Sequence, residues 1–540
     1  MTVLPIGKAV SLFSLAAALI VAGWWRLGLP VDMPASPRNP DEKLYCLSYA
    51  PFHGAQTPTD PTTLISPGQI DEDLAQLAAL TDCIRTYSVD FGLDYVPQAA
   101  RKHGLKVLLG VWLSSRPERN QFQITTGIAL AKQYPDVIRA LIVGNETLLR
   151  GEISAAALAD TLRAVKAQVQ QPVTYADVWE FWLRNRELAG AVDFVTIHIL
   201  PYWEDFPIAA DRAADHVASI RKRAVAEFPG KEIVIGETGW PSAGRMRERA
   251  LPSRANQARV IQDILVRGKQ ENFRVNIIEA YDQPWKRFFV GTVGGHWGLL
   301  DDATRRFKFS WGAPVSNHPA WRWQALGGVA LAGIIFGAAI AARRRSSLGE
   351  FDGRAWLIIT TSATIAGILS GWAVENATVE SLSIGGWLRS LALVAIAIAG
   401  PVACAAVVGR GVGMPSFDQI LAAPEDRVRD PVMLGVGLVS IVICLLAVQA
   451  ALGLAFDPRY RDFPFAPLTS GVAPFLLLKF SARPTPGPPA IAERVAACVL
   501  APSALYIVFN ETLANWQALW LGAVLILLAI SLARVRAARG

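Results

Sequence analysis

The sequence predicts an α/β chain in which a (β/α)8 TIM barrel is followed by an all-α membrane domain with several spans. Two observations support this prediction. Short apolar strands alternate with polar-faced helical segments eight times within residues 44–318, and long apolar runs separated by short loops fill residues 321–540. A hydrophobic content of 52% over 540 residues, with a mean hydropathy of +0.31, is high for a purely soluble protein.

Residues 1–28 are predicted to form a membrane anchor. Lys8 precedes an apolar run that ends in Trp24, Trp25 and Arg26, and this length and charge suit either a signal peptide or an anchor. We favour an uncleaved anchor with its N-terminus in the cytoplasm, because no small-residue cleavage site follows within the run and the tryptophan pair resembles an interfacial belt. The proline-rich residues 29–43 are the expected linker to the barrel.

Eight strands are expected in the barrel domain, residues 44–318. Helical segments such as 70–80, 155–169 and 211–227 lie between them. An open doubly wound sheet is the alternative, but neither a GxGxxG nor a Walker motif follows the first strand. The predicted strands are 45–50, 83–87, 106–111, 140–144, 173–176, 194–199, 232–236 and 274–280.

About seven spans are predicted in the membrane domain, which make eight with the anchor. The weakest is 463–478, which is short and contains three prolines, so that a re-entrant loop is its alternative. Almost no ionisable residue lies deep inside the spans, which disfavours ion-coupled transport. The predicted spans are 325–342, 355–374, 388–409, 432–454, 463–478, 495–509 and 516–532.

Basic residues at the ends of these runs predict the orientation of the chain. The net charge of +7 is explained by topology rather than by a nucleic-acid partner, because many arginines border apolar runs. Counting them as cytoplasmic places the barrel outside the cytoplasm and both termini inside. The residues counted are Lys8, 343–345, Arg410, Arg427, Arg429, Lys479, Arg483, Arg494, Arg534, Arg536 and Arg539.

The five cysteines show no metal-binding spacing. Cys404, Cys444 and Cys498 lie in apolar runs, where an inert packed thiol is expected. Cys46 and Cys83 each fall near the start of a predicted strand, and these strands are neighbours in a barrel. A disulfide between them in an oxidising compartment and two buried free thiols are both compatible with this placement.

Two carboxylates occupy the tips of predicted strands. Glu146 follows the fourth strand and Glu237 follows the seventh, so both are expected on the C-terminal rim, where barrels of this kind keep their chemistry. Retaining glycoside cleavage requires such a pair, one protonated and one ionised, at a separation of about 5 Å. His198 ends the sixth strand, and it is not expected to bind a metal because no second His or Cys lies nearby in sequence.

The sequences around the two glutamates are more specific. Val143-Gly-Asn-Glu146 and Ile235-Gly-Glu-Thr-Gly-Trp-Pro-Ser242 resemble the two catalytic motifs of glycoside hydrolase family 17, the β-1,3-glucanases and β-1,3-glucan transglycosylases. Ser48-Tyr-Ala-Pro-Phe52, Ile84-Arg-Thr-Tyr87 and Ile278-Glu-Ala-Tyr-Asp-Gln-Pro-Trp-Lys286 extend the resemblance over residues 45 to about 310. The whole layout is similar to bacterial membrane-bound members linked to β-(1,3)(1,6)-glucan synthesis.

The resemblance implies roles for individual residues. Glu146 becomes the general acid/base and Glu237 the nucleophile, while Asn145 would bind the sugar 2-hydroxyl beside it. No cofactor and no metal are implied. Further substrate-binding residues would be Tyr49, Tyr87, Tyr202 and Glu279 as walls of the site, with Trp203, Trp240, Trp285 and Trp297 as stacking surfaces, loop packing being the alternative for each tryptophan.

The resulting hypothesis is a retaining β-1,3-glucan transglycosylase at the outer face of a bacterial inner membrane, with a periplasmic barrel. Its expected partners are a β-1,3-glucan and the lipid bilayer, and a membrane glucan synthase is a further candidate. An endo-β-1,3-glucanase would use the same residues with water as the acceptor. A non-catalytic glucan-binding scaffold is the third hypothesis, which the presence of both glutamates disfavours.

Overall fold

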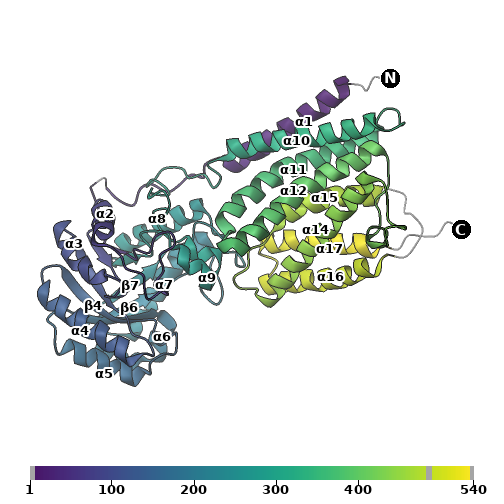
Figure 1. The fold of residues 1–540 in the computed structure, drawn as a ribbon. Helices are drawn as coiled ribbons and strands as arrows, with labels where there is room; N and C mark the ends of the chain where they lie inside the picture. The colour runs from purple at the N-terminus through teal and green to yellow at the C-terminus, as the bar shows by residue number, and fades with distance from the viewer. Residues whose placement is uncertain (1–5, 40, 482–488, 535–540) are drawn as a thin grey trace. The chain divides into compact units, whose positions relative to one another are not determined.

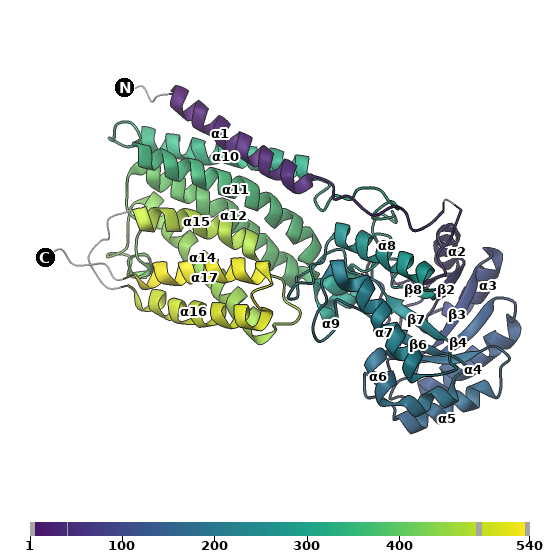
Figure 2. The same cartoon turned by 180° about the vertical axis from the view of Figure 1, so that it is seen from behind.

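The computed structural model describes residues 6–39, 41–481 and 489–534, which fall into two compact units. One unit is Val31–Val315, in which helices surround a closed sheet (Figures 1 and 2). The other joins Met1–Pro30 to Ser316–Gly540 and is helical. The N-terminal helix therefore belongs to the same compact unit as the C-terminal helices.

The sheet of the first unit is a closed parallel barrel, in which each strand pairs with the next and β1 pairs with β8. The predicted (β/α)8 architecture is thus confirmed. Four strands, β1, β2, β6 and β8, are shorter than the predicted ranges, and the ladders of β1, β2 and β8 stop where the chain turns into rim loops. The strands are β1 Cys46–Ser48, β2 Cys83–Arg85, β3 Lys106–Val111, β4 Ile138–Asn145, β5 Val173–Val178, β6 Val195–His198, β7 Ile233–Thr238 and β8 Val275–Ile277.

Three of the barrel helices, α2, α5 and α8, begin at serine caps and bury one apolar face. The hydroxyl groups of Ser66, Ser154 and Ser253 accept backbone N–H bonds at the starts of three helices, which satisfies donors that have no partner within the helix. Leu158 and Leu162 are buried along one side of such a helix. The helices are α2 Pro67–Leu77, α3 Val96–Lys102, α4 Pro117–Gln133, α5 Ala155–Lys166, α6 Trp179–Arg184, α7 Ala213–Glu227, α8 Arg254–Gln270 and α9 Arg287–Val290.

One disulfide and one backbone bridge connect parts of the barrel unit that are far apart in the sequence. Cys46 and Cys83 form a disulfide that joins β1 to β2, while Cys404, Cys444 and Cys498 remain free thiols. Val31 and Val315, at the two ends of this unit, pair in an antiparallel bridge with N–O distances of 2.9 and 3.0 Å. The chain therefore enters and leaves the barrel unit at adjacent points.

The helical unit contains seven helices, within the described residues, that are long and apolar enough to cross a membrane. The helix over the weakest predicted span, α15, is shorter at 17 residues and contains Pro474. It packs against α11, α12 and α17. The helices are α1 Ile6–Gly28, α10 Trp321–Arg344, α11 Gly353–Glu380, α12 Ser383–Arg410, α13 Phe417–Leu421, α14 Pro431–Phe456, α15 Phe465–Ser481, α16 Ile491–Glu511 and α17 Trp516–Ala533.

The basic residues used to predict the orientation gather at helix ends. Arg410 donates to the carbonyl oxygen of Arg345 at 2.9 Å, so the ends of α10 and α12 are neighbours. Arg534 likewise donates to the carbonyl oxygen of Lys479 at 3.1 Å, beside the ends of α15 and α17. Arg483, Arg536 and Arg539, which the prediction also used, lie outside the described residues.

Candidate active site

Glu146 and Glu237 come from the C-terminal ends of β4 and β7. Glu146 directly follows β4 and has a left-handed φ of 52°, and Gly144 before it has a φ of 86°. A β-carbon on Gly144 would lie 3.0 Å from Thr147 Oγ1 and 3.1 Å from the Tyr175 ring, so both conformation and space favour glycine. This turn directs Glu146 over the barrel mouth, where Glu237 lies one residue before the end of β7.

His198, the last residue of β6, connects the two carboxylates. Its Nδ1 lies 2.8 Å from Oε1 of Glu146, and its Nε2 lies 3.7 Å from Oε1 of Glu237. One ligand-type atom from each of the three residues lies within 4.8 Å of the others. Gly236 makes room for the ring, since a β-carbon there would approach His198 to 3.2 Å and the Thr196 methyl to 2.4 Å.

Arg85, the last residue of β2, is the cation beneath the pair. Its side chain is 1% exposed, and its guanidinium forms an ion pair with Oε1 of Glu237. The other terminal nitrogen donates to Oδ1 of Asn145. Planar guanidinium groups suit such two-sided contacts with oxygen acceptors. Arg85 thus fixes the positions of Glu237 and Asn145 relative to each other.

These cations keep Glu237 ionised. Burial alone would raise the pKa of this carboxyl group, but the charges of His198, Arg85 and Lys286 outweigh it and lower the pKa to about 2. Lys286 shows the opposite balance, since burial lowers its pKa to about 8 despite the attraction of Glu237 and Glu146. A carboxylate that stays charged at neutral pH is what a nucleophile requires.

Glu279 was expected to form part of the wall of the site, but it is buried next to Lys286. Its side chain is 1% exposed and forms an ion pair with Lys286. It therefore positions a cation beside Glu237. Asn145 is also buried, and its carbonyl oxygen already accepts from Arg85.

Several predicted substrate-binding aromatics are packed beneath the rim. Tyr49, Tyr202 and Trp240 are fully buried, and Trp297 is 3% exposed. Each of the first three bonds to protein: Tyr49 to Asp73 at 2.9 Å, Tyr202 to the Arg245 carbonyl at 2.9 Å and Trp240 to the Leu251 carbonyl at 3.1 Å. Trp240 and Trp297 therefore fit the loop-packing alternative that was stated for each tryptophan. Tyr49 and Tyr202, which were expected as walls of the site, are covered by the rim loops, and their role toward a substrate stays a prediction.

Other predicted aromatics keep part of their surface open. Tyr87, Trp203 and Trp285 are half-buried. Trp203 lies parallel to Trp297, with ring centroids 6.5 Å apart and an interplanar angle of 13°. The ring of Tyr87 lies 4.1 Å below the Arg85 guanidinium, and burial together with the Glu237 charge raises the pKa of its hydroxyl group. These three remain the candidates for contact with a sugar.

Glu146, His198 and Glu237 also form the kind of cluster that can ligate a metal ion. The Arg85 guanidinium already contacts Oε1 of Glu237, and a second cation there would be repelled by it. The donor set therefore fits acid–base chemistry between two carboxylates better than a metal centre. The prediction that no metal is required stays a prediction.

Three cationic or ionisable residues of the site were not assigned a role from the sequence. Arg85, His198 and Lys286 all reach the glutamates. A signal existed for Arg85, because a charged residue at the end of the apolar strand Cys-Ile-Arg must be compensated when it is buried. No spacing rule links residues 85, 198 and 286, since only barrel closure brings β2, β6 and the turn after β8 together.

Part of this chain is similar in sequence to proteins of known name. A probable beta-glucosidase btgE from Neosartorya fischeri is 30% identical over 227 residues, which are 40% of this chain and 40% of that protein. A glucan 1,3-beta-glucosidase from Arthroderma benhamiae is 28% identical over 264 residues, 44% of this chain and 83% of the relative. The chain thus spans two fifths of the length of the first relative.

A solved structure with a similar fold is an active-site mutant of the Rhizomucor miehei beta-1,3-glucanosyltransferase in complex with laminaritriose. It is 26% identical, with a TM-score of 0.44, and the match covers 49% of this chain and 95% of that one. The family model described as the BtgE/BtgC glycoside hydrolase domain matches residues 46–298. The barrel, from β1 to the segment just after β8, is therefore the part of the chain that matches a glycoside hydrolase domain.

Proposed function

We propose that this protein is a retaining β-1,3-glucan transglycosylase. The observation that carries the proposal is the approach of Glu146 and Glu237, whose nearest oxygens lie within 4.8 Å on the rim of the barrel. Retaining enzymes hold their carboxyl groups about 5 Å apart, whereas inverting enzymes need roughly 6.5–9.5 Å for a water molecule between carboxylate and sugar. The short separation supports direct attack by a carboxylate.

In the first step, the ionised Glu237 attacks the anomeric carbon and forms a glycosyl ester. The glycosidic bond breaks, and its oxygen leaves with a proton from Glu146. Arg85 and His198 both face Oε1 of Glu237. That arrangement leaves Oε2 to attack while Oε1 stays fixed. Similarly, His198 holds Oε1 of Glu146, and Oε2 of Glu146 is available to carry the transferred proton.

In the second step, an acceptor hydroxyl group loses its proton to Glu146 and attacks the same carbon. The ester bond breaks and Glu237 is released as a carboxylate. When the acceptor is a sugar hydroxyl, such as a 6-hydroxyl, the product is a branch or a ring. When the acceptor is water, the enzyme is an endo-β-1,3-glucanase. The names of the relatives, beta-glucosidase and glucan 1,3-beta-glucosidase, support a β-glucan substrate.

We assign the chemistry to residues 44–318 and membrane attachment to residues 1–28 and 321–540. The seven long apolar helices support a membrane location. The basic residues at the ends of α10, α12 and α15 support an orientation with those ends in the cytoplasm and the barrel in the periplasm of a bacterial inner membrane. A glucan synthase in the same membrane remains the candidate partner that would supply the chain to be remodelled.

The full chain, purified in detergent and incubated with linear β-1,3-gluco-oligosaccharides, tests the proposal. Longer or 1,6-linked products, identified by mass spectrometry and NMR, are expected. If only shorter products form, the protein is an endo-β-1,3-glucanase and not a transglycosylase. If a folded chain forms no products, it is a non-catalytic glucan-binding scaffold.

The roles of the glutamates are tested with azide as an external nucleophile. Glu237→Ala lacks the attacking carboxylate, so azide should attack the substrate once and give an α-glycosyl azide. Glu146→Ala can still form the ester, so azide should give the β-glycosyl azide. Glu187→Gln, an exposed carboxylate in the helical turn Arg186–Ala191, is the control that should keep full activity. The reverse azide stereochemistry would exchange the two assignments.

A further inference from the structure

A buried tyrosine–aspartate pair lies beside the loop that carries Glu146. Tyr175 and Asp177 are two residues apart on β5, so their side chains point to the same face of the strand. Both residues are fully buried, and the hydroxyl group of Tyr175 donates to Oδ2 of Asp177. Neither residue stands in the sequence motifs around the two glutamates. The reaction steps described above therefore leave this pair without a role.

The pair binds two consecutive backbone N–H groups of the loop after β4. The N–H of Leu148 donates to the hydroxyl oxygen of Tyr175 at 2.9 Å. The next N–H, that of Leu149, makes a longer contact of 3.4 Å with Oδ2 of Asp177. Oδ1 of Asp177 accepts the N–H of Val178 at 2.8 Å, which fixes the plane of the carboxylate. The pair thus fastens the loop to β5.

The backbone of Glu146 is attached to the same stretch of β5. Its N–H donates to the carbonyl oxygen of Ala176 at 2.8 Å, between the two members of the pair. On the other side of Glu146, a β-carbon on Gly144 would lie 3.1 Å from two carbons of the Tyr175 ring, so the ring packs closely against this turn. The chain is therefore held from β5 before, at and after the glutamate.

Glu146 needs this support because its backbone is in the left-handed region, with a φ of 52°. Such a conformation costs a residue with a side chain about 1 kcal/mol or more, and it persists where the surroundings impose it. The Glu146 side chain is 23% exposed, and its Oε1 lies 2.8 Å from Nδ1 of His198. A relaxed backbone would move this carboxyl group away from both His198 and Glu237.

We propose that Tyr175 and Asp177 are positioning residues that hold Glu146 in the geometry required for proton transfer. The proposal rests on the proposed function, because it concerns the acid/base group of that reaction. Glu146 gives a proton to the leaving oxygen in the first step and takes one from the acceptor hydroxyl group in the second. Glu237 is held from β2 by Arg85. Loss of the pair should therefore weaken proton transfer much more than attack by the nucleophile.

Tyr175→Phe in the full chain tests this role, since it removes only the hydroxyl group. The ring packs against Trp182 with centroids 5.6 Å apart, and phenylalanine can keep that contact. An unactivated β-1,3-gluco-oligosaccharide needs a proton on its leaving oxygen, whereas 2,4-dinitrophenyl β-laminaribioside releases dinitrophenolate without one. We expect kcat/KM to fall about tenfold for the oligosaccharide and less than about twofold for the aryl glycoside. An equal fall for both substrates would overturn the proposal.

Asp177→Ala separates the position of Glu146 from the charge beside it. Burial raises the pKa of Asp177 to about 6, and the charge of Glu146 adds to this shift, so the assays are run above pH 7, where Asp177 is ionised. Tyr175→Phe keeps that charge and Asp177→Ala removes it. Both variants should show the same selective loss for the oligosaccharide. A loss in Asp177→Ala alone would mean that its charge acts on Glu146, and it would overturn the positioning role.

The combined variant and a matched control complete the series. Tyr175→Phe together with Asp177→Ala should be no slower than Asp177→Ala, because the hydroxyl group and the carboxylate act as one unit. Losses that simply multiply would contradict this unit. The control is Tyr134→Phe, at a buried tyrosine that follows α4 and accepts from Gln133 at 3.3 Å. It should keep both rates.

The attachment of the loop can be measured without any activity. Hydrogen–deuterium exchange, followed by mass spectrometry on peptides that cover residues 146–152, reports on the N–H groups of Leu148 and Leu149. Exchange there should be slow in the natural chain and at least about tenfold faster in Tyr175→Phe and Asp177→Ala. Unchanged exchange in both variants would overturn the proposal. Faster exchange in these variants, when the natural chain cleaves neither substrate, would overturn the proposed function and leave the attachment in place.

Discussion

The barrel gathers charged side chains in one cluster, whereas the buried charged residues of the helical unit lie at the ends of different helices. The barrel cluster consists of Arg85, His198, Glu237, Glu279 and Lys286. The buried charged residues described in the helical unit are Arg343, Asp462, Glu493 and Glu511, and all of them lie in or beside terminal turns of helices. In the barrel the charges compensate one another. In the helical unit they lie where helix ends can reach polar surroundings, as expected for spans in a bilayer.

This difference shows which unit can do chemistry. A cluster of opposing charges in a low-dielectric site shifts pKa values and holds reacting groups in place. The middle of the helical unit instead offers hydroxyl groups that satisfy backbone carbonyls: Ser470 donates to the carbonyl oxygen of Ala397 at 2.7 Å, and Ser370 donates to the same atom at 3.3 Å. Substitutions in the two units should therefore have effects of different kinds.

The largest effect is expected for Arg85→Gln. It leaves the Glu237 carboxylate buried without its guanidinium partner, which should cost about 3–5 kcal/mol of stability and reduce kcat/KM by about a thousandfold. Kinetics on β-1,3-gluco-oligosaccharides and thermal unfolding of the full chain measure both effects. Arg101→Gln, which removes an exposed pair with Asp136, is the matched control and should change stability by less than about 1 kcal/mol. Equal effects of the two variants would mean that the buried Arg85 pair matters no more than the exposed Arg101 pair.

Ala397→Asp should be the most harmful change in the helical unit. Ala397 is fully buried in the middle of α12, so a carboxylate there would be held away from water. An insertion penalty of about 3 kcal/mol is expected, so the amount of chain in the membrane fraction should fall about a hundredfold. Quantitative blotting of fractionated cells measures this. Ala397→Ser should have little effect, and a normal level of the aspartate variant would show that this unit tolerates isolated charge.

Loss of the disulfide should destabilise the barrel alone. The bond closes a loop with a sequence separation of 37 residues between β1 and β2, and its removal should cost about 2–4 kcal/mol. Cys46→Ser combined with Cys83→Ser should lower the melting temperature of the barrel transition of the full chain. Cys404→Ser and Cys444→Ser provide the comparison in the helical unit, and reductant should reproduce the effect of the first pair only.

Lys286→Met should shift the pH profile of cleavage at its acidic end. Lys286 is one of three cations that lower the pKa of Glu237, so its loss should raise that pKa by about one unit. Because the active form of Glu237 is the ionised one, rate is lost as the pH falls through this pKa, and the acidic limb should move to higher pH. Lys269→Met, at an exposed lysine paired with Glu42, should not move it.

The smallest effect is expected for Ser470→Ala. It removes the hydrogen bond from α15 to the Ala397 carbonyl of α12 and the longer one with the Ser370 hydroxyl, and such bonds are worth about 0.6 kcal/mol each inside helical membrane domains. Thermal inactivation of the full chain in detergent should change by a few degrees at most. A loss as large as that of Ala397→Asp would mean that α15, the shortest apolar helix, depends on this bond for its place among the other helices.

Much of the fold could be predicted because its signals are local. Alternating apolar strands and helices indicated the barrel, and Gly144 and Gly236 lie within two residues of the C-terminal ends of β4 and β7. The strand limits at β1, β2 and β8 were less accurate, because residues such as Tyr49 and Ala280 are apolar enough to extend a strand although they belong to loops. Hydrophobicity along one segment does not record where its neighbour stops pairing.

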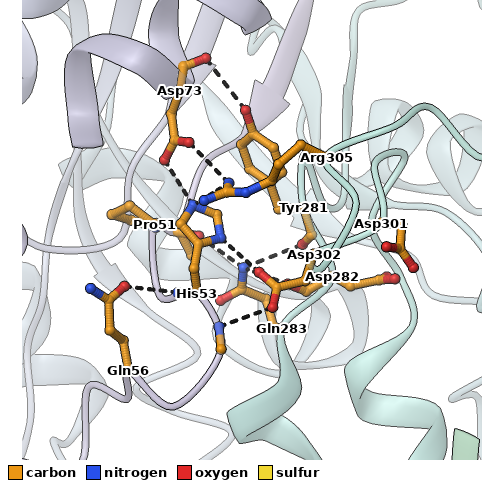
Figure 3. Close-up of polar contacts among 12 residues, drawn as sticks. Pro51, His53, Gln56, Asp73, Tyr281, Asp282, Gln283, Asp301, Asp302 and Arg305 are labelled. Carbon is orange, nitrogen blue, oxygen red and sulfur yellow. Dashed lines mark hydrogen bonds and ion pairs between the residues drawn. The ribbon is translucent and has the colours of Figure 1, made fainter. Parts of the chain in front are cut away.

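The site was predictable only in part for the same reason. Glu146 and Glu237 stand in sequence motifs, and barrel topology brings them together. The burial of Tyr49, Tyr202 and Trp240 depends on loops that fold over one another, which no residue pattern records. The side chains of His53, Asp73, Asp302 and Arg305 contact one another (Figure 3) but come from segments as far apart as residues 53 and 305, so their cluster appears only in three dimensions.

The backbone bridge between Val31 and Val315 holds the two ends of the barrel unit next to each other. Within the helical unit, the hydroxyl group of Ser316 donates to the carbonyl oxygen of Gly28 at 2.8 Å, so the ends of that unit at the two connections are also held together. Residues 31–315 could therefore be excised and replaced by a short flexible linker without separating α1 from α10. A different domain with adjacent ends could be inserted at the same position. Because two chain segments connect the units, cleavage of one segment would leave the other connection intact.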